Sequence, residues 1–281
     1  MITEELQKLH RVELEILREL IRVCELLHIP YFAVYGTAIG AIRHQGFIPW
    51  DDDIDIGMLR KDFTLFMEKA PELLAEGFTL QYRKTDPNYF ILHAKIRKDN
   101  TTFLEQGYEQ ATGHQGIFID IFPFDYLPES KLARRYFCLK RKVYQNLLSL
   151  DYEQNYWKLP GWKNKIRAII KMIAKRIFPD KMAIAKRFDA LLESLPESRY
   201  ICEQEVRRCF YLTEWFKGIK KVKFENMDIN IMEGYHNYLT TFYGDYMTPP
   251  PVEQQVPRHF HGIIDTERSY THYTGNNLNK H

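Results

Sequence analysis

"GTAIGAIRHQGFIPWDDDIDIGM", residues 36–58, is the stretch from which the rest of this sequence is interpreted. Its acidic residues Asp51, Asp52, Asp53 and Asp55 crowd into five positions between apolar residues. Side chains alternate faces along a β-strand, so Asp53 and Asp55 share one face while the isoleucines beside them face the core. Two carboxylates on one strand face repel each other unless a cation neutralises them. The stretch therefore predicts a strand that carries a cation site into the core.

A second acidic strand is expected over residues 116–125, "GIFIDIFPFD". Asp120 stands alone in the middle of this apolar run, where burying an unpaired carboxylate is costly. A cation shared with Asp53 and Asp55 would supply the missing partner. Oxygen-only ligation is typical of Mg²⁺ or Mn²⁺. A solvated loop or a satisfied edge residue would explain each motif alone, but the order of the motifs favours the shared cation.

A phosphate site is expected just before the aspartates. The apolar strand 31–36 ends at Gly36, and Thr37 opens a short helix over 37–44. The free backbone N–H groups at the start of a helix bind phosphate. Arg43 and His44 follow one to two turns later, where they can reach the same phosphate.

Composition sets broad limits. The chain has 281 residues, 45% of them hydrophobic, and a net charge of +2, which fits one large or two modest domains and indicates no partner. Its four cysteines form no CxxC pair and fit a reducing compartment. The charged, amphipathic first thirty residues resemble neither a signal peptide nor a membrane span. A cytoplasmic location is the expectation.

The pattern predicts an α+β or α/β fold, a nucleotidyltransferase-like mixed sheet with flanking helices and a helical, basic insertion. Helix 4–28 repeats apolar residues at helical spacing, with Glu13 as the charged exception. The other expected helices are 61–76, 130–150, 162–178, 181–194, 202–214 and 234–244, and the other expected strands are 53–58, 78–83, 89–97 and, as strand or loop, 221–232. The expected domains are a catalytic core (1–125), a basic helical region (126–218), a segment completing the core (219–268) and a flexible tail (269–281).

Residues 36–58 resemble the signature of the LicD family of phosphocholine transferases. Residues 116–125 and "YLTTFYGDYMTPPP" (238–251) are similar to its later motifs, and the resemblance covers roughly 1–125 and 220–261. It implies a nucleotidyltransferase-like fold. It also implies transfer of phosphocholine from CDP-choline to a hydroxyl of a lipid-linked glycan precursor, of the teichoic acid or lipopolysaccharide type.

The resemblance also implies residue roles. Asp53 and Asp55 match the metal-binding pair, Asp120 matches the third carboxylate, and Asp51 matches a recurrent acid that is a ligand or a neighbour of ligands. We take Asp53, Asp55 and Asp120 as the catalytic set, with Asp120 as either a proton acceptor or a ligand only. Asp52 is interpreted as a loop acid held by backbone N–H groups. We expect Asp53→Asn and Asp120→Asn each to lower activity by orders of magnitude yet fold normally, because removing one like charge relieves repulsion.

Choline is a quaternary ammonium, which proteins hold over aromatic faces. Trp50, beside the aspartates, is the candidate for this contact. Gly36, Thr37, Arg43, His44 and Trp50 therefore form the predicted donor-binding set.

Alternatives remain open at this point. The fukutin-related transferases share the first motif, so another phosphoalditol, such as phosphoribitol or phosphoglycerol, could be transferred from a CDP-linked donor. A non-catalytic nucleotide-binding or nucleic-acid-binding protein is the outside alternative, and the sequence lacks the aromatic stacking platform expected for nucleic acid. His93, Lys95 and Arg97 share one face of a predicted strand, where they bind phosphates or form a solvated face.

Positive charge is concentrated in the middle of the chain. Residues 131–176 contain thirteen Lys or Arg and only two acids, Asp151 and Glu153. Residues 163–178 alternate apolar and basic residues at helical spacing. Such a helix lies on an anionic membrane or is a core helix with a solvated face.

Overall fold

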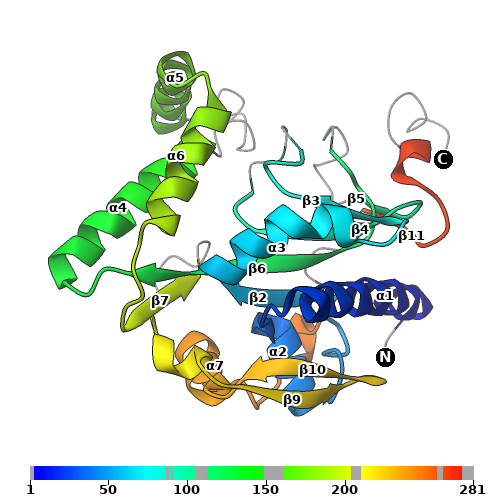
Figure 1. Cartoon of the computed structure of the whole chain (residues 1–281). Helices are drawn as coiled ribbons and strands as arrows, with labels where there is room; N and C mark the ends of the chain where they lie inside the picture. Colours follow the sequence, from blue (N-terminus) through cyan, green and yellow to red (C-terminus); the bar gives the residue numbers. More distant parts are fainter. Residues whose placement is uncertain are drawn as a thin grey trace.

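The computed structural model describes residues 3–86, 89, 91–104, 113–148, 161–203, 210–257 and 262–273. A mixed sheet of seven strands forms its centre, with the order β1-β2-β6-β4-β3, and β7 and β8 continue from β6 (Figure 1). Only β2 and β6 run parallel among these pairs. The predicted fold class is confirmed. The strands are β1 (Phe32–Ala33), β2 (Asp55–Leu59), β3 (Phe78–Gln81), β4 (Ala94–Lys98), β6 (Phe118–Leu127), β7 (Tyr200–Glu203) and β8 (Tyr211–Leu212).

Three helices pack around the sheet: α1 (Glu4–Leu27), α2 (Tyr35–Arg43) and α3 (Arg60–Leu73). α1 begins where the Thr3 hydroxyl accepts a hydrogen bond from the Leu6 N–H, 3.2 Å away. It ends at His28, whose left-handed backbone (φ 54°) closes the last turn. Its apolar face lies against β4 and β6 and contacts α3.

Strand register places the acidic motifs side by side. The parallel ladder of β2 and β6 pairs Asp55 with Asp120. The antiparallel ladder of β4 and β6 pairs Lys95 with the same Asp120. Directly paired residues on neighbouring strands project to the same face. The three side chains therefore form a row across the middle of the sheet.

β6 runs through Pro123, a residue type that usually ends a strand. Proline cannot donate a ladder hydrogen bond, so it is tolerated in a strand only where no partner needs its N–H. β4 pairs with β6 as far as Ile121, and β7 takes over that edge at Phe124. Pro123 lies between the two partners, which explains why the strand continues.

A helical arm projects from the sheet and consists of α4 (Lys131–Leu148), α5 (Trp162–Ile177) and α6 (Lys181–Glu193) (Figure 1). α4 and α6 pack around a second apolar core that includes Phe137 and Phe188. A buried ion pair between Arg83 and Asp189 ties α6 to the main body.

The predicted helix over 202–214 is wrong within the described residues. Tyr200–Glu203 forms β7, Tyr211–Leu212 forms β8, and Thr213–Phe216 forms the short 3₁₀ helix η3. The edge of β6 beyond Pro123 supplies backbone partners, and Tyr211 is fully buried among aromatic rings. Tertiary pairing therefore overrides local helix propensity. This part of the expected helical region belongs to the main sheet.

The remaining elements complete the body. The hairpin of β9 (Ile219–Phe224) and β10 (Met227–Met232) covers β1 and α2, and α7 (Tyr235–Tyr243) contacts α2. β5 (Thr102–Leu104) pairs with β11 (Ile263–Asp265). The last short 3₁₀ helices are η4 (Val252–Gln254) and η5 (Tyr270–His272). In the described part of the chain, every helix is too short or too polar to cross a bilayer.

Candidate active site

A cleft of about 560 Å³ opens over the acidic row of the sheet. Its walls come from α2, from β6, from the segment that contains and follows α7, and from the loop of residues 44–54, which we call the aspartate loop. The lining residues are Tyr35, Gly36, Ile39, Arg43, Ile48, Trp50, Asp51, Asp53, Asp55, His93, Asp120, Phe122, Phe242, Tyr243, Asp245, Tyr246, Thr248 and Pro250.

Asp53, Asp55 and Asp120 meet at the floor of this cleft. One carboxylate oxygen from each lies within 4.8 Å of the others, and all three side chains are buried. An octahedral Mg²⁺ with ligands at 2.0–2.1 Å places donor oxygens about 3 to 4 Å apart. The trio therefore matches a divalent-cation site after small side-chain adjustments.

Two bases hold Asp120 in its ionised form. Lys95 Nζ lies 2.7 Å and His93 Nε2 lies 3.2 Å from Asp120 Oδ1. Burial alone would raise the pKa of Asp120, but the attraction of Lys95 and His93 outweighs it and holds that pKa well below its usual value. Both bases contact Oδ1, so Oδ2 is the oxygen that remains for a cation.

The pKa of Asp55 is shifted in the opposite direction. Burial raises its pKa well above the usual value, and the charges of Asp53 and Asp120 raise it further. Its backbone N–H donates to the Thr37 hydroxyl, 2.8 Å away, which fixes the start of β2 against α2. The site thus carries uncompensated negative charge next to one well-neutralised carboxylate.

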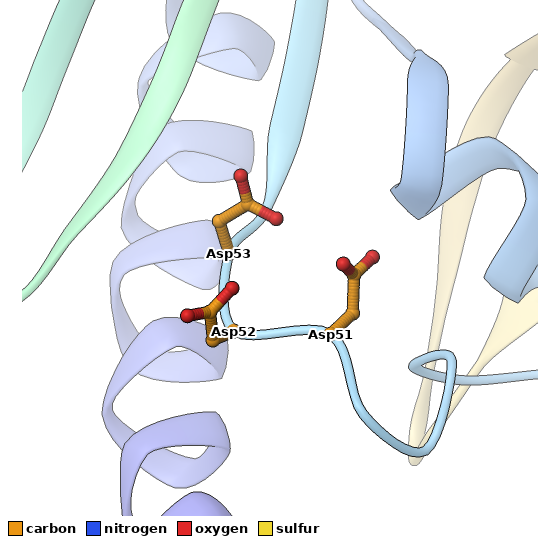
Figure 2. Close-up of side chains that lie close together, drawn as sticks. All are labelled: Asp51, Asp52 and Asp53. Atoms are coloured by element: carbon orange, nitrogen blue, oxygen red, sulfur yellow. The ribbon is translucent and has the colours of Figure 1, made fainter. Parts of the chain in front are cut away.

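The aspartate loop follows α2 in the sequence and lies in space between α1 and α2. Figure 2 shows Asp51, Asp52 and Asp53 projecting from it. His10 of α1 fixes the loop: its Nε2 lies 2.8 Å from the Asp51 carbonyl oxygen, and its ring stacks on Phe47. The three loop carboxylates also come within 4.8 Å of one another, forming a second acidic group with Asp52 fully buried.

Two features of the site were not predicted from the sequence: the contact of Asp51 with Gly36 and the burial of Glu13. The Asp51 carboxylate lies against Gly36, where an added Cβ would stand 2.3 Å from Oδ2. Glu13 of α1 is 1% exposed, and its Oε2 has no hydrogen-bond partner among the described residues. Burial and the charge of Asp53 raise the pKa of Glu13 well above its usual value. The signal for Glu13 was its position as the charged exception on an apolar helix face.

Comparison with known proteins agrees with this geometry. Residues 28–160 match the family model described as LicD/FKTN/FKRP, nucleotidyltransferase domain. Residues 28–160, slightly less than half of the chain, thus form a LicD-type nucleotidyltransferase domain. The resemblance drawn from residues 36–58 and 116–125 is therefore confirmed, and both motifs lie inside the matched range.

Relatives extend the match beyond this domain. The chain is 28% identical to a Haemophilus influenzae protein named lipopolysaccharide cholinephosphotransferase LicD, over 84% of this chain and 89% of that protein. It is 37% identical to an uncharacterised Rickettsia prowazekii protein, over 25% of this chain and 29% of that protein. An uncharacterised Rickettsia typhi protein is 40% identical over 20% of this chain and 18% of its own length.

The LicD-type domain brings only part of the predicted donor-binding set to the cleft. Gly36, Arg43 and Trp50 line it. Thr37 is buried behind it as the acceptor for the Asp55 N–H. His44 is exposed and is not among the lining residues; the Arg43 Nε–H donates to its Nε2.

The bases of β4 are buried rather than solvated. Lys95 neutralises Asp120 and His93 Nε2 lies against it, while Arg97 donates to the Gln81 side chain and to the Gly116 carbonyl oxygen. The solvated-face interpretation is wrong because all three side chains are at least nine-tenths buried.

An aromatic wall faces the acids of the LicD-type domain, and most of it was missed. It consists of Tyr35, Trp50, Phe122, Phe242, Tyr243 and Tyr246. The last three come from α7 and the residues after it, outside the matched range 28–160. Arg43 holds that segment in place by donating to the Tyr246 carbonyl oxygen, 2.8 Å away. The available signal was the resemblance of residues 238–251 to a family motif.

Proposed function

We propose that this protein transfers phosphocholine from CDP-choline to a hydroxyl of a glycan precursor, with the help of a divalent cation. The observation that supports it best is one cleft that combines a buried acidic trio with an aromatic wall. Acidic oxygens suit a cation and its pyrophosphate partner, and aromatic faces suit a quaternary ammonium. The name of the Haemophilus relative supports the same activity.

The proposed cation ligands are Asp53, Asp55 and Asp120, with Asp51 at the mouth of the cleft. When bound, Mg²⁺ or Mn²⁺ would neutralise charge on the donor pyrophosphate, a contribution that dominates phosphoryl transfer. Arg43, beside Asp51 in the cleft, is placed to contact a donor phosphate.

The proposed reaction replaces one phosphoester bond by another. The acceptor hydroxyl oxygen bonds to the phosphorus that bears choline, the bond from that phosphorus to the bridging oxygen breaks, and CMP leaves with the electron pair. Asp120 is a poor proton acceptor, because two bases stabilise its ionised form. We assign it to ligation. His93, which lines the cleft and contacts Asp120, is the better candidate to receive the hydroxyl proton.

The aromatic wall is the basis for choosing choline over an alditol. A cation above Trp or Tyr rings gains attraction that a neutral ribitol or glycerol does not. The acceptor as a lipid-linked glycan is a further part of this proposal and is supported by the resemblance alone. The cytoplasmic location, also proposed, rests on the cysteine pattern and the amphipathic first thirty residues. The domain boundaries given above are proposed with β7 and β8 moved from the helical region to the core.

The deciding experiment is CMP release with Mg²⁺ or Mn²⁺ and three donors: CDP-choline, CDP-ribitol and CDP-glycerol. We expect release from CDP-choline alone, dependent on the metal and on an added glycan acceptor. Trp50→Leu should raise KM for CDP-choline about tenfold, as expected for losing one desolvated cation–π contact, while Trp50→Phe changes it less.

Asp53→Asn is the matched loss-of-function control, with activity expected to fall by about 10²–10³-fold or more. Release from CDP-ribitol or CDP-glycerol but not CDP-choline would overturn the choline assignment and keep the transferase. Equal turnover by wild type and Asp53→Asn would overturn the assignment of the acidic trio.

A further inference from the structure

The arm helix α5 presents its apolar side chains to solvent. Trp162, Ile170 and Ile177 are 68%, 61% and 63% exposed, whereas Ala168 is buried. α5 carries seven large apolar residues, and all of them are exposed. At about 100° per residue, six of them cover an arc of roughly 100°, Met172 lies about 60° beyond that arc, and Ala168 lies on the opposite side of the helix. We call these six residues the α5 stripe: Trp162, Ile166, Ile169, Ile170, Ile173 and Ile177.

This orientation is the reverse of that of a core helix. A surface helix normally buries its apolar stripe and exposes its polar face. In α5 the least exposed positions, Asn164, Ala168, Lys171 and Ala174, are small or polar. Contiguous exposed apolar surface of this kind marks an interaction site. Figure 1 places α5 at the outer end of the arm, away from the sheet.

Charge identifies the partner. α5 carries six Lys or Arg residues and no acid, and α4 likewise carries six and no acid. Lys165 and Arg176 are exposed on one flank of the α5 stripe, and Lys163 is exposed on the other. Long basic side chains beside an apolar stripe reach anionic headgroups while the stripe contacts acyl chains. A second copy of this basic surface would meet like charge instead.

We propose that α5 docks on an anionic lipid bilayer, lying in the plane of the interface with the α5 stripe inserted between headgroups and flanked by its lysines and arginine. This surface lies outside the cleft, and the proposal does not depend on the enzymatic assignment. It would hold the protein at the surface on which a lipid-linked acceptor resides.

The test is sedimentation of the full chain with vesicles of phosphatidylcholine, with and without one-quarter phosphatidylglycerol. We expect binding to the anionic vesicles only, weakened by high salt because headgroup attraction is screened. Ile170→Glu/Ile173→Glu should lower the partition coefficient at least about tenfold, and Lys165→Gln/Arg176→Gln should lower it and reduce its salt dependence. Trp162 emission should shift to shorter wavelength on anionic vesicles, a change absent in Trp162→Phe.

Val252→Glu/Val256→Glu is the matched control, because it adds the same charge at equally exposed apolar positions outside the arm. It should bind like wild type. Wild-type binding by Ile170→Glu/Ile173→Glu, or equal binding to neutral vesicles, would overturn the proposal. So would a wild-type dimer that fails to bind vesicles and becomes monomeric in Ile170→Glu/Ile173→Glu, because the α5 stripe would then be a self-association surface.

Discussion

Two aspartates paired across neighbouring strands have opposite electrostatic environments. Asp55 is buried among like charges, whereas Asp120 is neutralised by Lys95 and contacts His93. The expectation that Asp120→Asn would fold normally by relieving repulsion is therefore wrong in its premise. It holds better for Asp55, which carries the unrelieved charge.

Substitution of these two residues should change stability in opposite directions. In EDTA at pH 7, Asp55→Asn should unfold at a higher temperature than wild type, because it replaces a carboxyl whose ionised form is disfavoured by burial and by neighbouring like charge. Asp120→Asn should be less stable by about 3 kcal/mol, because it leaves buried Lys95 without its carboxylate. Differential scanning calorimetry measures both.

The pH dependence follows from the sign of each pKa shift. A carboxyl whose folded pKa is raised, such as that of Asp55, holds its proton when the unfolded chain has lost it above about pH 4. Wild-type stability therefore falls as pH rises from there, and the advantage of Asp55→Asn should grow. For Asp120 the folded pKa is lowered, so its contribution is present above about pH 4 and is lost on acidification. The measurement is the free energy of unfolding of wild type, Asp55→Asn and Asp120→Asn as a function of pH. If all three free energies changed in parallel between pH 4 and pH 7, this description would be contradicted.

At the scale of elements, a buried ion pair holds α3 on the central strand. Arg60 Nε lies 2.6 Å from Asp125 Oδ1, its Nη2 lies 3.1 Å from Oδ2, and both side chains are buried. The pair lies outside the cleft, five residues along β6 from Asp120. It therefore stabilises the scaffold of the site without touching ligands.

Removing one partner should be costly. Arg60→Met should lower the free energy of unfolding by about 3–5 kcal/mol, because it removes the guanidinium that pairs with the buried Asp125 side chain. Chemical denaturation measures this change. The double variant Arg60→Met/Asp125→Leu should recover most of the loss, and CMP release at low temperature should match wild type in both. A single variant as stable as wild type would show that the pair does not hold α3.

At the scale of the whole molecule, the cleft joins segments almost two hundred residues apart. The acids come from the loop before β2, from β2 itself and from β6, while Phe242, Tyr243 and Tyr246 come from α7 and the residues after it. Ligand binding should therefore stabilise the two ends of the chain together.

We expect the divalent cation to bind first and the nucleotide to bind only to the cation-loaded protein. Saturating Mn²⁺ or Mg²⁺ should raise the unfolding temperature, and CDP should raise it further only when the cation is present. A ligand at a hundred times its Kd adds about 2.7 kcal/mol, or roughly 5 °C or more for a chain of this size. Asp53→Asn should lose both effects. A CDP shift that persists in EDTA would separate nucleotide binding from the acidic trio.

The sequence by itself determined what depends on local spacing. Alternation predicted that Asp53 and Asp55 lie together, although the strand begins only at Asp55 and Asp53 belongs to the loop before it. Helical periodicity predicted α1, α3 and α4, and the motif in residues 36–58 indicated the LicD-type domain. The pairing of Asp120 with Lys95 was decided only by the tertiary structure, because strand order and register are not encoded in either strand alone. The aromatic wall and the outward α5 stripe likewise depend on which distant segments pack together. Periodicity shows that a face is apolar, but only packing decides whether that face is buried.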